Sequence, residues 1–390
     1  MIALQVIFWI SLLLIFYTYL LFPAILFLLA KKKGEVAGPE KKQACPLVSV
    51  LIAAFNEKEV IAGKVETILK GAYPLDNLEV LIGSDASTDG TSQELEKLAA
   101  DHPVIRTFIF EQRTGKPGVI NHLAEKAEGE ILVITDANVM LHERTITEVV
   151  SGFDHPSVGL VDTMMINTHL KKDGISEQER YYISREVRIK HHESVIWGSM
   201  MGPFGGCYAV RKSLYRPVPD NFLVDDFYIN MSVLKQDYRC ISNPEAKVYE
   251  DVSNSLREEF RRKKRISAGN FQNLAVFGKM AFTGPPGVPF CFLSHKVIRW
   301  IVPFLVMVTL GSSLVLGFQL PLYRILAILH GVVLAIPLLD LFLRLFKIHA
   351  VPLRFISHFV LMNLALLAGF IRYLGGIRSN VWQPTRRSRY

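Results

Sequence analysis

The hydrophobic positions of this 390-residue chain follow two kinds of pattern. Near both ends they form long runs, whereas between about residues 46 and 280 short apolar runs alternate with stripes at helical spacing. A run of more than about 20 apolar residues is long enough to cross a bilayer. Short apolar runs that alternate with helices are typical of a mostly parallel sheet covered by helices on both faces. The pattern therefore predicts an α/β domain held between membrane segments.

Short runs rich in Val, Ile and Leu predict strands that are buried on both faces of the sheet. These strands are expected at residues 47–54, 78–83, 105–111 and 131–135. A helical stripe precedes the last of them and consists of Ile120, Leu123, Ala124 and Ala127. Residues 177–195 are charged and also helical in pattern.

The apolar runs near the ends predict membrane segments. Residues 2–29 are interpreted as an uncleaved anchor, because the basic start, short core and small-residue cleavage site of a signal peptide are not clear. The lysines at 31–33 then place the next domain in the cytoplasm. Two spans are expected at 301–318 and 322–346, and polar residues interrupt a third run at 351–374. We expect that third segment to be tilted or interfacial, because the arginine-rich tail then stays inside.

Together these patterns predict an integral protein of the cell (inner) membrane with its α/β domain in the cytoplasm. Its expected parts are an N-terminal anchor (1–30), a linker (31–45), the α/β domain (46–280), an interfacial segment (281–300), C-terminal transmembrane or interfacial helices (301–376) and a basic cytoplasmic tail (377–390). The net charge of +8 comes with basic clusters beside apolar stretches, which favours lipid headgroups over nucleic acid as a partner. The four cysteines form no CxxC motif, so they indicate neither a zinc site nor a redox site.

Polar side chains follow the predicted strands where these end. Asp136 and Asn138 follow the strand at 131–135. The carboxyl edge is where open α/β sheets bind ligands, and oxygen donors there suit Mg²⁺ or Mn²⁺ carrying a phosphate. The other interpretation is a plain Asp-Ala-Asn turn that ends the strand.

Other polar segments are expected at the same edge. Asn56 and Glu57 follow the first strand and can bind a base or ribose, or cap the next helix. Asp85 follows the second strand and can accept a hydrogen bond from a nucleotide, or belong to an Asx-rich turn. Lys116 precedes a helical stripe, where it can meet a phosphate or be an ordinary surface lysine.

The second half of the domain adds three candidate segments. Asp225 and Asp226 are adjacent carboxylates in an apolar setting, of which one can act as a general base, or both can mark a helix N-terminus. The segment Phe204-Gly205-Gly206 allows a backbone to approach a ligand closely, or is a plain turn. The basic run at 261–265 is either a membrane-surface stripe or a clamp for a diphosphate.

The order of these motifs resembles that of membrane-bound family 2 glycosyltransferases with the GT-A fold, the group that includes cellulose, chitin and hyaluronan synthases. The resemblance covers roughly residues 46–273 and a tail motif at 382–386. It implies a Rossmann-like, mostly parallel sheet, a nucleotide-sugar donor, and Asp136 and Asn138 as ligands of Mg²⁺ or Mn²⁺. The donor-binding residues that it implies are Ala54, Asn56, Glu57, Asp85, Lys116, Asp136 and Arg262.

The same resemblance implies that Asp226 is the catalytic base and that Arg265 contacts the diphosphate. The acceptor-side residues that it implies are Phe204, Gly205, Gly206, Asp225, Trp382 and Thr385. The chain departs from the family pattern at two places. Asn138 stands where an acid commonly ligates the metal, and residues 262–266 keep only the arginine of the motif Gln-x-x-Arg-Trp.

We therefore expect an inverting, metal-dependent glycosyltransferase that moves a sugar from a nucleotide-sugar, expected to be a UDP-sugar, to a lipid-linked or polysaccharide acceptor at the membrane, forming a β-linkage. The alternative is a processive polysaccharide synthase that also translocates its product, against which the altered Gln-x-x-Arg-Trp position counts. A binding subunit without catalysis is disfavoured because the acidic residues Asp85, Asp136 and Asp226 are all present. A transporter is disfavoured because no paired broken helices are evident. The donor sugar, the acceptor and the oligomeric state stay open.

Overall fold

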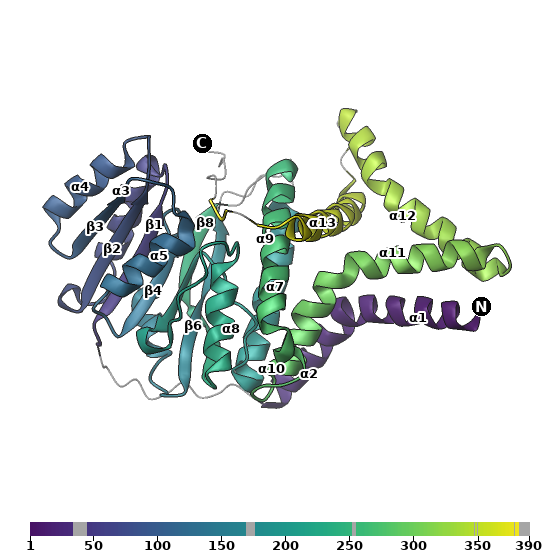
Figure 1. Ribbon diagram of the computed structural model, residues 1–390, viewed down its shortest axis with the longest axis horizontal. Helices are drawn as coiled ribbons and strands as arrows, with labels where there is room; N and C mark the ends of the chain where they lie inside the picture. The colour runs from purple at the N-terminus through teal and green to yellow at the C-terminus, as the bar shows by residue number, and fades with distance from the viewer. Residues whose placement is uncertain are drawn as a thin grey trace.

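Eight strands form one sheet in the order β3-β2-β1-β4-β7-β6-β8-β5 (Figure 1). The computed structural model describes residues 1–33, 45–168, 176–251, 255–346, 348, 350–377 and 379–381. The strands are β1 (Val48–Ala54), β2 (Leu78–Asp85), β3 (Ile105–Phe110), β4 (Ile131–Asp136), β5 (Met140–Leu141), β6 (Val158–Thr168), β7 (Cys207–Arg211) and β8 (Arg239–Asp251). The first four are the strands that the apolar runs predict, each within two residues at either end. They run parallel to one another, so the predicted mostly parallel sheet is confirmed.

The antiparallel strand β7 decides what meets at the carboxyl edge of the sheet. It lies between β4 and β6, and its first residue, Cys207, pairs with Thr135 near the end of β4. The loop before β7 therefore lies at the edge of the sheet where β4 ends. Strand β6 is antiparallel to β7 and parallel to β8, so the end of β8 reaches the same edge.

Helices cover both faces of the sheet, and on each face they bury an apolar core cluster against the strands. On one face the buried residues come from α3 (Lys58–Leu69), α4 (Thr91–Asp101) and α6 (Thr145–Ser151). On the other face they come from α5 (Gly115–Lys126), α8 (Asp225–Lys235) and α9 (Leu256–Phe277). Short 3-10 turns occupy Leu75–Asn77, Lys212–Leu214 and Gly278–Ala281.

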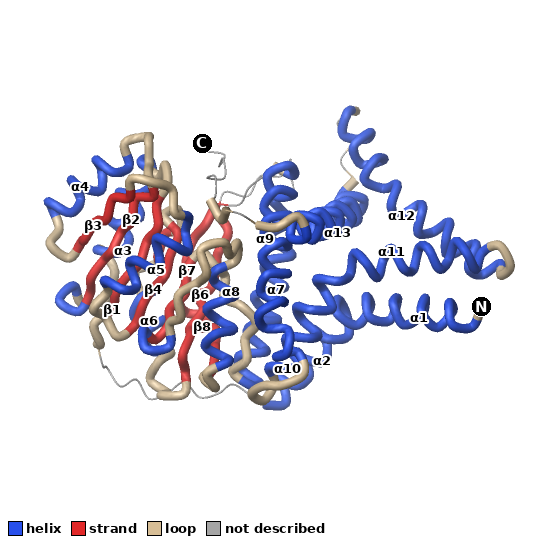
Figure 2. The backbone as a smooth tube through the Cα atoms, in the orientation of Figure 1, coloured by secondary structure: helices blue, strands red, loops and turns tan. Residues whose placement is uncertain are grey.

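The remaining helices form the second part of the molecule (Figure 2). They are α1 (Ile2–Phe16), η1 (Tyr17–Leu21), α2 (Phe22–Lys33), α7 (Ser176–Trp197), α10 (Val288–Cys291), η5 (Phe292–Val297), α11 (Ile298–Gly317), α12 (Pro321–Leu345) and α13 (Val351–Leu374). Within the described residues, four helices are long and apolar enough to cross a membrane, namely Ile2–Lys33, Val288–Gly317, Pro321–Leu345 and Val351–Leu374. One lies at the N-terminus and three follow the sheet domain, whereas the sequence predicts the last of these, at 351–374, to be tilted or interfacial.

The structure adds detail to two of the predicted C-terminal segments. From Val288 the segment 281–300 is helical and continues into α11, and its place at the membrane interface stays a prediction. The third polar-interrupted run, α13, packs along α9 of the sheet domain. Ser267 Oγ donates to the carbonyl oxygen of Leu366 at 2.7 Å, and the rings of Phe271 and Phe370 lie 4.8 Å apart. These contacts join α13 to the sheet domain.

A buried ionic cluster joins α7, which packs on the sheet domain, to the apolar helices. Glu186 on α7 accepts hydrogen bonds from His295 (2.7 Å) and Lys296 (2.7 Å) on η5 and from Arg299 (2.6 Å) at the start of α11. His295 also contacts Glu193 at 2.7 Å through its other ring nitrogen. Figure 1 shows α7 and α9 between the sheet and the helices α1, α11 and α12. The charged side chains of α7 therefore lie at an interface, where its glutamates contact basic residues of η5 and α11.

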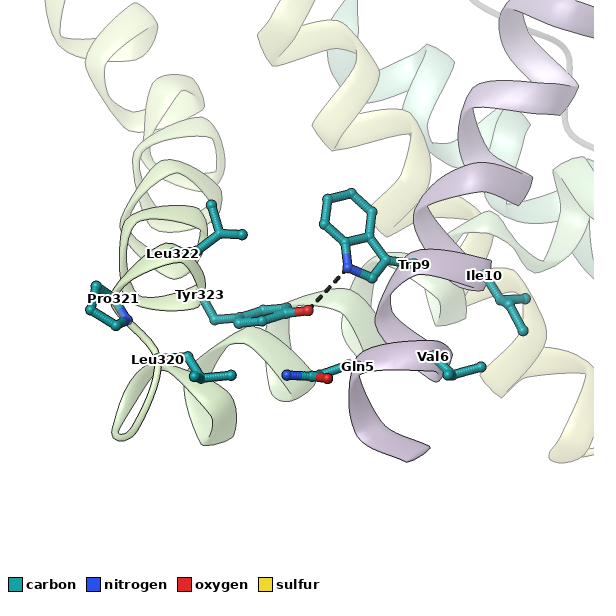
Figure 3. Close-up of a pocket in the computed structure, with 8 residues that line it drawn as sticks. All are labelled: Gln5, Val6, Trp9, Ile10, Leu320, Pro321, Leu322 and Tyr323. Atoms are coloured by element: carbon teal, nitrogen blue, oxygen red, sulfur yellow. Dashed lines mark hydrogen bonds between the residues drawn. The ribbon is translucent and has the colours of Figure 1, made fainter. Parts of the chain in front are cut away.

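A hollow of about 620 Å³ lies among the membrane helices. Residues of α1 and of the α11–α12 turn line it, and Trp9 Nε1 donates to the hydroxyl of Tyr323 at 3.0 Å (Figure 3). None of its lining residues belongs to the sheet or to the carboxyl edge. It therefore takes no part in the site described next.

Candidate active site

Lys116, the second residue of α5, lies among carboxylates from two other elements. Its Nζ donates to Oδ1 of Asp136 at 2.7 Å and lies 3.7 Å from Oδ2 of Asp225. It also reaches the carbonyl oxygen of Gly205 at 3.3 Å. Burial acts to lower the pKa of Lys116, but attraction to Asp136 and Asp225 outweighs burial and the pKa rises. The ammonium therefore stays charged at neutral pH and holds the end of β4 close to the start of α8.

Asp226 lies against the glycine loop that precedes β7. A Cβ added to Gly205 would sit 2.5 Å from Oδ2 of Asp226, so only glycine permits this approach. Burial, and then the neighbouring charge of Asp225, raise the pKa of Asp226 to about 6. The side chain is still partly exposed. A reachable carboxylate with a pKa near neutrality has the properties of a general base.

Two arginines of the basic run on α9 face different partners. Arg265 donates to the carbonyl oxygen of Leu223 at 3.3 Å, just before α8. Burial and repulsion from Arg262 lower the pKa of Arg265, while Asp225 and Asp136 act in the opposite direction. Arg262 instead lies 3.8 Å from Glu259 on its own helix. The structure thus brings Arg265 under the influence of these carboxylates, while Arg262 lies beside Glu259 on α9.

Asp85 holds the loop that leads into α5. It is fully buried and accepts hydrogen bonds from Arg113 Nε (2.9 Å) and from the backbone N–H groups of Thr114 (2.7 Å) and Gly115 (3.1 Å). The guanidinium of Arg113 also lies 3.3 Å from the ring centre of Phe55. These bonds fix the start of α5 and thereby the position of Lys116. A direct contact of Asp85 with a nucleotide stays a prediction.

Asn56 and Glu57 join the loops that follow β1 and β2. Asn56 has a φ of 55°, and its Oδ1 accepts the backbone N–H of Thr88 at 2.8 Å. The N-cap of α3 is Glu57, without a side-chain cap, so the alternative in which Asn56 caps that helix is wrong. Ala54 is fully buried at the end of β1, where only its backbone can meet a ligand. All three residues border the same edge as Asp85.

The turn after β4 places Asn138 beside a carboxylate that the sequence analysis missed. Asn138 Nδ2 donates to Oε1 of Glu250 at 3.1 Å, near the end of β8. Within the described residues, no three His, Cys, Asp or Glu side chains gather in a way that could hold a metal ion. Glu250 lies 112 residues from Asn138 in the chain, and the pairing of β8 with β6 and with β5, in which Tyr249 pairs with Met140, brings it here.

The loop containing Phe204 is anchored by a buried ion pair that sequence reasoning also missed. Lys190 Nζ donates to Oδ2 of Asp162 at 2.6 Å, and Oδ1 of Asp162 accepts the backbone N–H of Phe204 at 2.9 Å. Burial raises the pKa of Asp162 although Lys190 opposes the shift. The carbonyl oxygen of Gly206 accepts the backbone N–H of Asp136 at 2.9 Å. These bonds connect the loop before β7 with the turn after β4.

The described part of the chain thus brings most of the predicted residues to one edge. The residues around Lys116 are Asp136, Gly205, Asp225, Asp226 and Arg265. Trp382 and Thr385 lie outside the described residues. Two positions before Trp382, Asn380 is buried and packs against Gly115 at the start of α5. The last described residues of the chain therefore reach the start of α5.

Residues 49–217, from β1 to just beyond β7, match the family profile described as Glycosyl transferase family 2. This part of the chain is a glycosyltransferase family 2 domain. The predicted enzyme class is confirmed at the level of this domain, which contains Asp85, Lys116 and Asp136. Asp225, Asp226 and Arg265 lie beyond the matched range, and their roles rest on geometry.

Proteins similar to this chain include named glycosyltransferases. The beta-monoglucosyldiacylglycerol synthase of Nostoc sp. is 26% identical over 242 residues, which cover 60% of this chain and 51% of that protein. The N-acetylglucosaminyltransferase of Azorhizobium caulinodans is 24% identical over 266 residues, covering 62% of this chain and 64% of that protein. The chain thus spans about half the length of the first relative.

A solved structure confirms the fold class. The mannosyltransferase of Pyrobaculum calidifontis, in complex with GDP-Man and Mn²⁺, superposes with a TM-score of 0.70 at 21% identity. The superposition covers 94% of this chain and 99% of that chain, so it includes the apolar helices as well as the sheet. The predicted GT-A domain flanked by such helices is therefore correct.

Proposed function

We propose that this protein is an inverting, metal-dependent glycosyltransferase that moves a sugar from a nucleotide-sugar to an acceptor at a membrane. The observation that carries the proposal is the contact of Lys116 with Asp136 and Asp225, with Asp226 beside them, at the carboxyl edge of a family 2 domain. A UDP-sugar is the donor that the sequence favours. The Pyrobaculum neighbour, which was solved with GDP-Man, makes a GDP-sugar the second donor to test.

The donor would lie along the edge from β2 to β4. Asn56, Glu57 and Asp85 border the nucleoside end, and Lys116 faces the diphosphate end. Because the pKa of Lys116 is raised, its ammonium is charged when a phosphate arrives. A fixed positive charge at that position attracts the diphosphate and offsets the charge that develops as it leaves.

The donor set fits a hard divalent cation. The carboxylate of Asp136 already faces a positive charge, the ammonium of Lys116 at 2.7 Å. Because Nδ2 of Asn138 donates to Glu250, the carbonyl oxygen of Asn138 is the atom left to serve as a ligand. Mg²⁺ and Mn²⁺ bind commonly through one or two carboxylates together with substrate phosphates. When bound, the cation would supply Lewis-acid charge for the departing diphosphate.

Asp226 would take the proton from the acceptor hydroxyl. The acceptor oxygen then forms a bond to the anomeric carbon while the bond from that carbon to the diphosphate breaks, and the configuration inverts to β. Lys116 and Arg265 carry the positive charge that balances the leaving group. Asp225, which is buried, positions Lys116 at 3.7 Å and raises the pKa of Asp226.

The acceptor would be lipid-linked or a glycan presented at the membrane surface. Four helices long enough to span a bilayer flank the sheet domain, and the Nostoc relative is named as a synthase of a glucosyl lipid. The three lysines that end α2 favour a location of the sheet domain in the cytoplasm. The protein would then lie in the inner membrane of the cell. Diacylglycerol is therefore the first acceptor to test.

The test uses the full chain in lipid nanodiscs with UDP- and GDP-sugars, with and without Mn²⁺. We expect release of nucleoside diphosphate and transfer to diacylglycerol. Asp226→Asn should bind nucleotide normally and lose about 10²–10⁴-fold in turnover, the usual contribution of a general base. Glu125→Gln, on the exposed side of α5, is the matched control and should keep full activity. Near-normal turnover by Asp226→Asn, or no nucleotide binding by the wild type, would overturn the proposal.

A further inference from the structure

A fully buried lysine lies beneath the turn that carries Asp136 and Asn138. Lys64 belongs to α3, and its side chain has no exposed surface. Its Nζ donates to Oγ1 of Thr135 at 2.8 Å and to the carbonyl oxygen of Val139. Within the described residues this ammonium makes no ion pair. It is held by neutral oxygen atoms alone.

Packing does not account for a lysine at this position. Its neighbours on the buried side of α3 are Ile61, Val65 and Ile68. Burying an ammonium away from a carboxylate partner is unfavourable, so an apolar residue would fill the space more stably. Burial lowers the pKa of Lys64 to about 8, while Cys207 on β7 and Asp136 on β4 act to raise it. The amine therefore remains mostly charged at neutral pH despite its surroundings.

The two bonds from Lys64 hold both ends of the turn. Thr135 precedes Asp136 and Val139 follows Asn138, so one ammonium joins the residues on either side of the two candidate ligands. The turn is closed by a bond from the backbone N–H of Val139 to the carbonyl oxygen of Asp136 at 3.2 Å. Lys64 reinforces that closure from below.

The same bonds reach the acceptor side of the site. Oγ1 of Thr135 donates to the carbonyl oxygen of Gly206 at 3.0 Å. Gly206 follows Gly205, whose carbonyl oxygen accepts from Lys116 and whose Cα lies against Asp226. Lys64 is thus linked through Thr135 to the loop that borders the candidate base.

We propose that Lys64 is a positioning residue of the donor site, which clamps the Asp136–Asn138 turn so that both side chains meet the diphosphate and its cation. This inference rests on the proposed function and adds a residue to it. Lys64 touches neither the donor nor the acceptor and acts through Thr135 and Val139. Asp136 then feels two ammonium groups, that of Lys116, which donates to it at 2.7 Å, and that of Lys64, whose pKa it helps to raise.

The experiment measures nucleotide binding by the full chain with UDP plus Mn²⁺ and with GDP plus Mn²⁺, by titration calorimetry. Lys64→Met should weaken the affinity of whichever nucleotide the wild type binds by about 10–100-fold, the usual effect of losing a partner behind a metal ligand. The KM for the donor should rise far more than kcat falls. Lys70→Met is the control, since Lys70 caps the same helix with a side chain that is 74% exposed.

Thr135 supplies a second pair of variants. Thr135→Val removes the hydroxyl that accepts from Lys64, whereas Thr135→Ser keeps it. We expect the valine variant to resemble Lys64→Met and the serine variant to resemble the wild type. The double variant Lys64→Met/Thr135→Val should bind nucleotide no more weakly than the worse single variant, because both changes break one link.

The outcomes separate three cases. If the wild type binds neither nucleotide, the proposed function fails. If the wild type binds nucleotide and Lys64→Met binds it equally well, Lys64 is not a positioning residue. The same holds if part of the Lys64→Met protein is unfolded and the folded part binds nucleotide with unchanged affinity. Should Lys64→Met fail to fold, the comparison of Thr135→Val with Thr135→Ser decides, and equal affinities for these two variants overturn the inference.

Discussion

At the scale of single residues, neighbouring charges in the site shift the pKa values of Lys116 and Asp226 in the direction that their proposed roles require. Lys116 stays charged because Asp136 and Asp225 outweigh the effect of burial on its pKa. Asp226 has a raised pKa because it is buried and lies beside Asp225. One lysine and two adjacent acids thus provide a fixed cation and a carboxylate that titrates close to neutral pH.

The first prediction concerns the pH dependence of catalysis. Asp226 must be ionised to accept a proton, so kcat/KM should fall about tenfold per unit below the pKa of about 6. Asp225→Asn removes a negative neighbour and should move this acid limb to lower pH. Initial rates between pH 4.5 and 8 test the shift, with Glu125→Gln as the control. An acid limb that stays in place or moves upward in Asp225→Asn contradicts the assignment.

The second prediction concerns stability. The pKa of Asp226 is raised in the folded state from 3.8 to about 6, so folding favours its protonated form. The stabilisation from this group is complete below the unfolded pKa and is lost as the pH rises through about 6. Asp226→Asn should therefore raise the thermal midpoint at pH 7 while it abolishes turnover. The gain should vanish near pH 4, and a midpoint lowered at pH 7 would show that the carboxylate is stabilising instead.

The third prediction concerns Gly205. An alanine Cβ at this position would lie 2.5 Å from Oδ2 of Asp226, closer than real Cβ atoms come. Gly205→Ala should displace Asp226 and lower kcat by at least about tenfold, while nucleotide affinity stays near the wild-type value. Gly278→Ala, where the added carbon meets only the flexible Leu274 side chain at 3.8 Å, is the matched control. Equal kcat values in the two variants would exclude a role for this close approach.

At the scale of elements, buried polar bonds align loops from distant parts of the chain. The loop before β7 is fixed by Asp162 on β6 and Lys190 on α7, two residues with side chains that are 1% and 4% exposed. The turn after β4 is fixed by Lys64 on α3. Strand β7 itself, antiparallel between β4 and β6, brings these loops together. The site is therefore built on the rigid sheet, and buried charges orient its edge.

The fourth prediction concerns the pair of Asp162 and Lys190. Lys190→Met leaves a buried carboxylate without its cation, and breaking a buried pair in this way costs about 3–5 kcal/mol. The thermal midpoint should fall clearly, and the donor KM should rise because Phe204 loses its anchor. Asp162→Asn combined with Lys190→Met should recover part of the stability. A double variant that is less stable than Lys190→Met would argue against an uncompensated charge as the cause.

At the scale of the whole molecule, the sheet domain and the apolar helices meet through buried charge. Glu186 accepts hydrogen bonds from three basic residues of η5 and the start of α11. Burial acts to raise the pKa of Glu186, but these cations outweigh burial and the pKa lies well below its usual range. The carboxyl edge is thereby held at a constant position relative to the helices that would present a membrane-bound acceptor.

The fifth prediction tests this junction. Glu186→Gln removes the charge that three cations share, so the contact of α7 with α11 should loosen. Hydrogen exchange should rise in α7 and in residues 292–299, while the strands β1, β2 and β4 keep their protection. Transfer to a lipid acceptor should fall more than hydrolysis of the donor by water. Unchanged exchange in α7 would show that apolar contacts alone hold the junction.

The sequence by itself determined the parts that depend on local pattern. Apolar runs predicted β1 to β4, because a strand buried on both faces must be apolar throughout. The polar residues at the ends of those strands, such as Asp85 and Asp136, were expected at one edge because parallel strands end together. Long apolar segments predicted the flanking helices, because a bilayer demands a minimum length.

Only the tertiary structure decided which distant residues meet. Asp225 lies 109 positions after Lys116, and nothing in the local pattern fixes the 3.7 Å between their charged atoms. Lys64 stands within an apolar helical stripe, and Glu250 lies next to the end of a strand that sequence patterns did not predict. Their partners follow from the placement of β7 and β8, which long-range pairing sets. The local sequence determines which polar side chains follow the strands at the carboxyl edge of the sheet. The distances between those side chains depend on contacts between segments about a hundred residues apart.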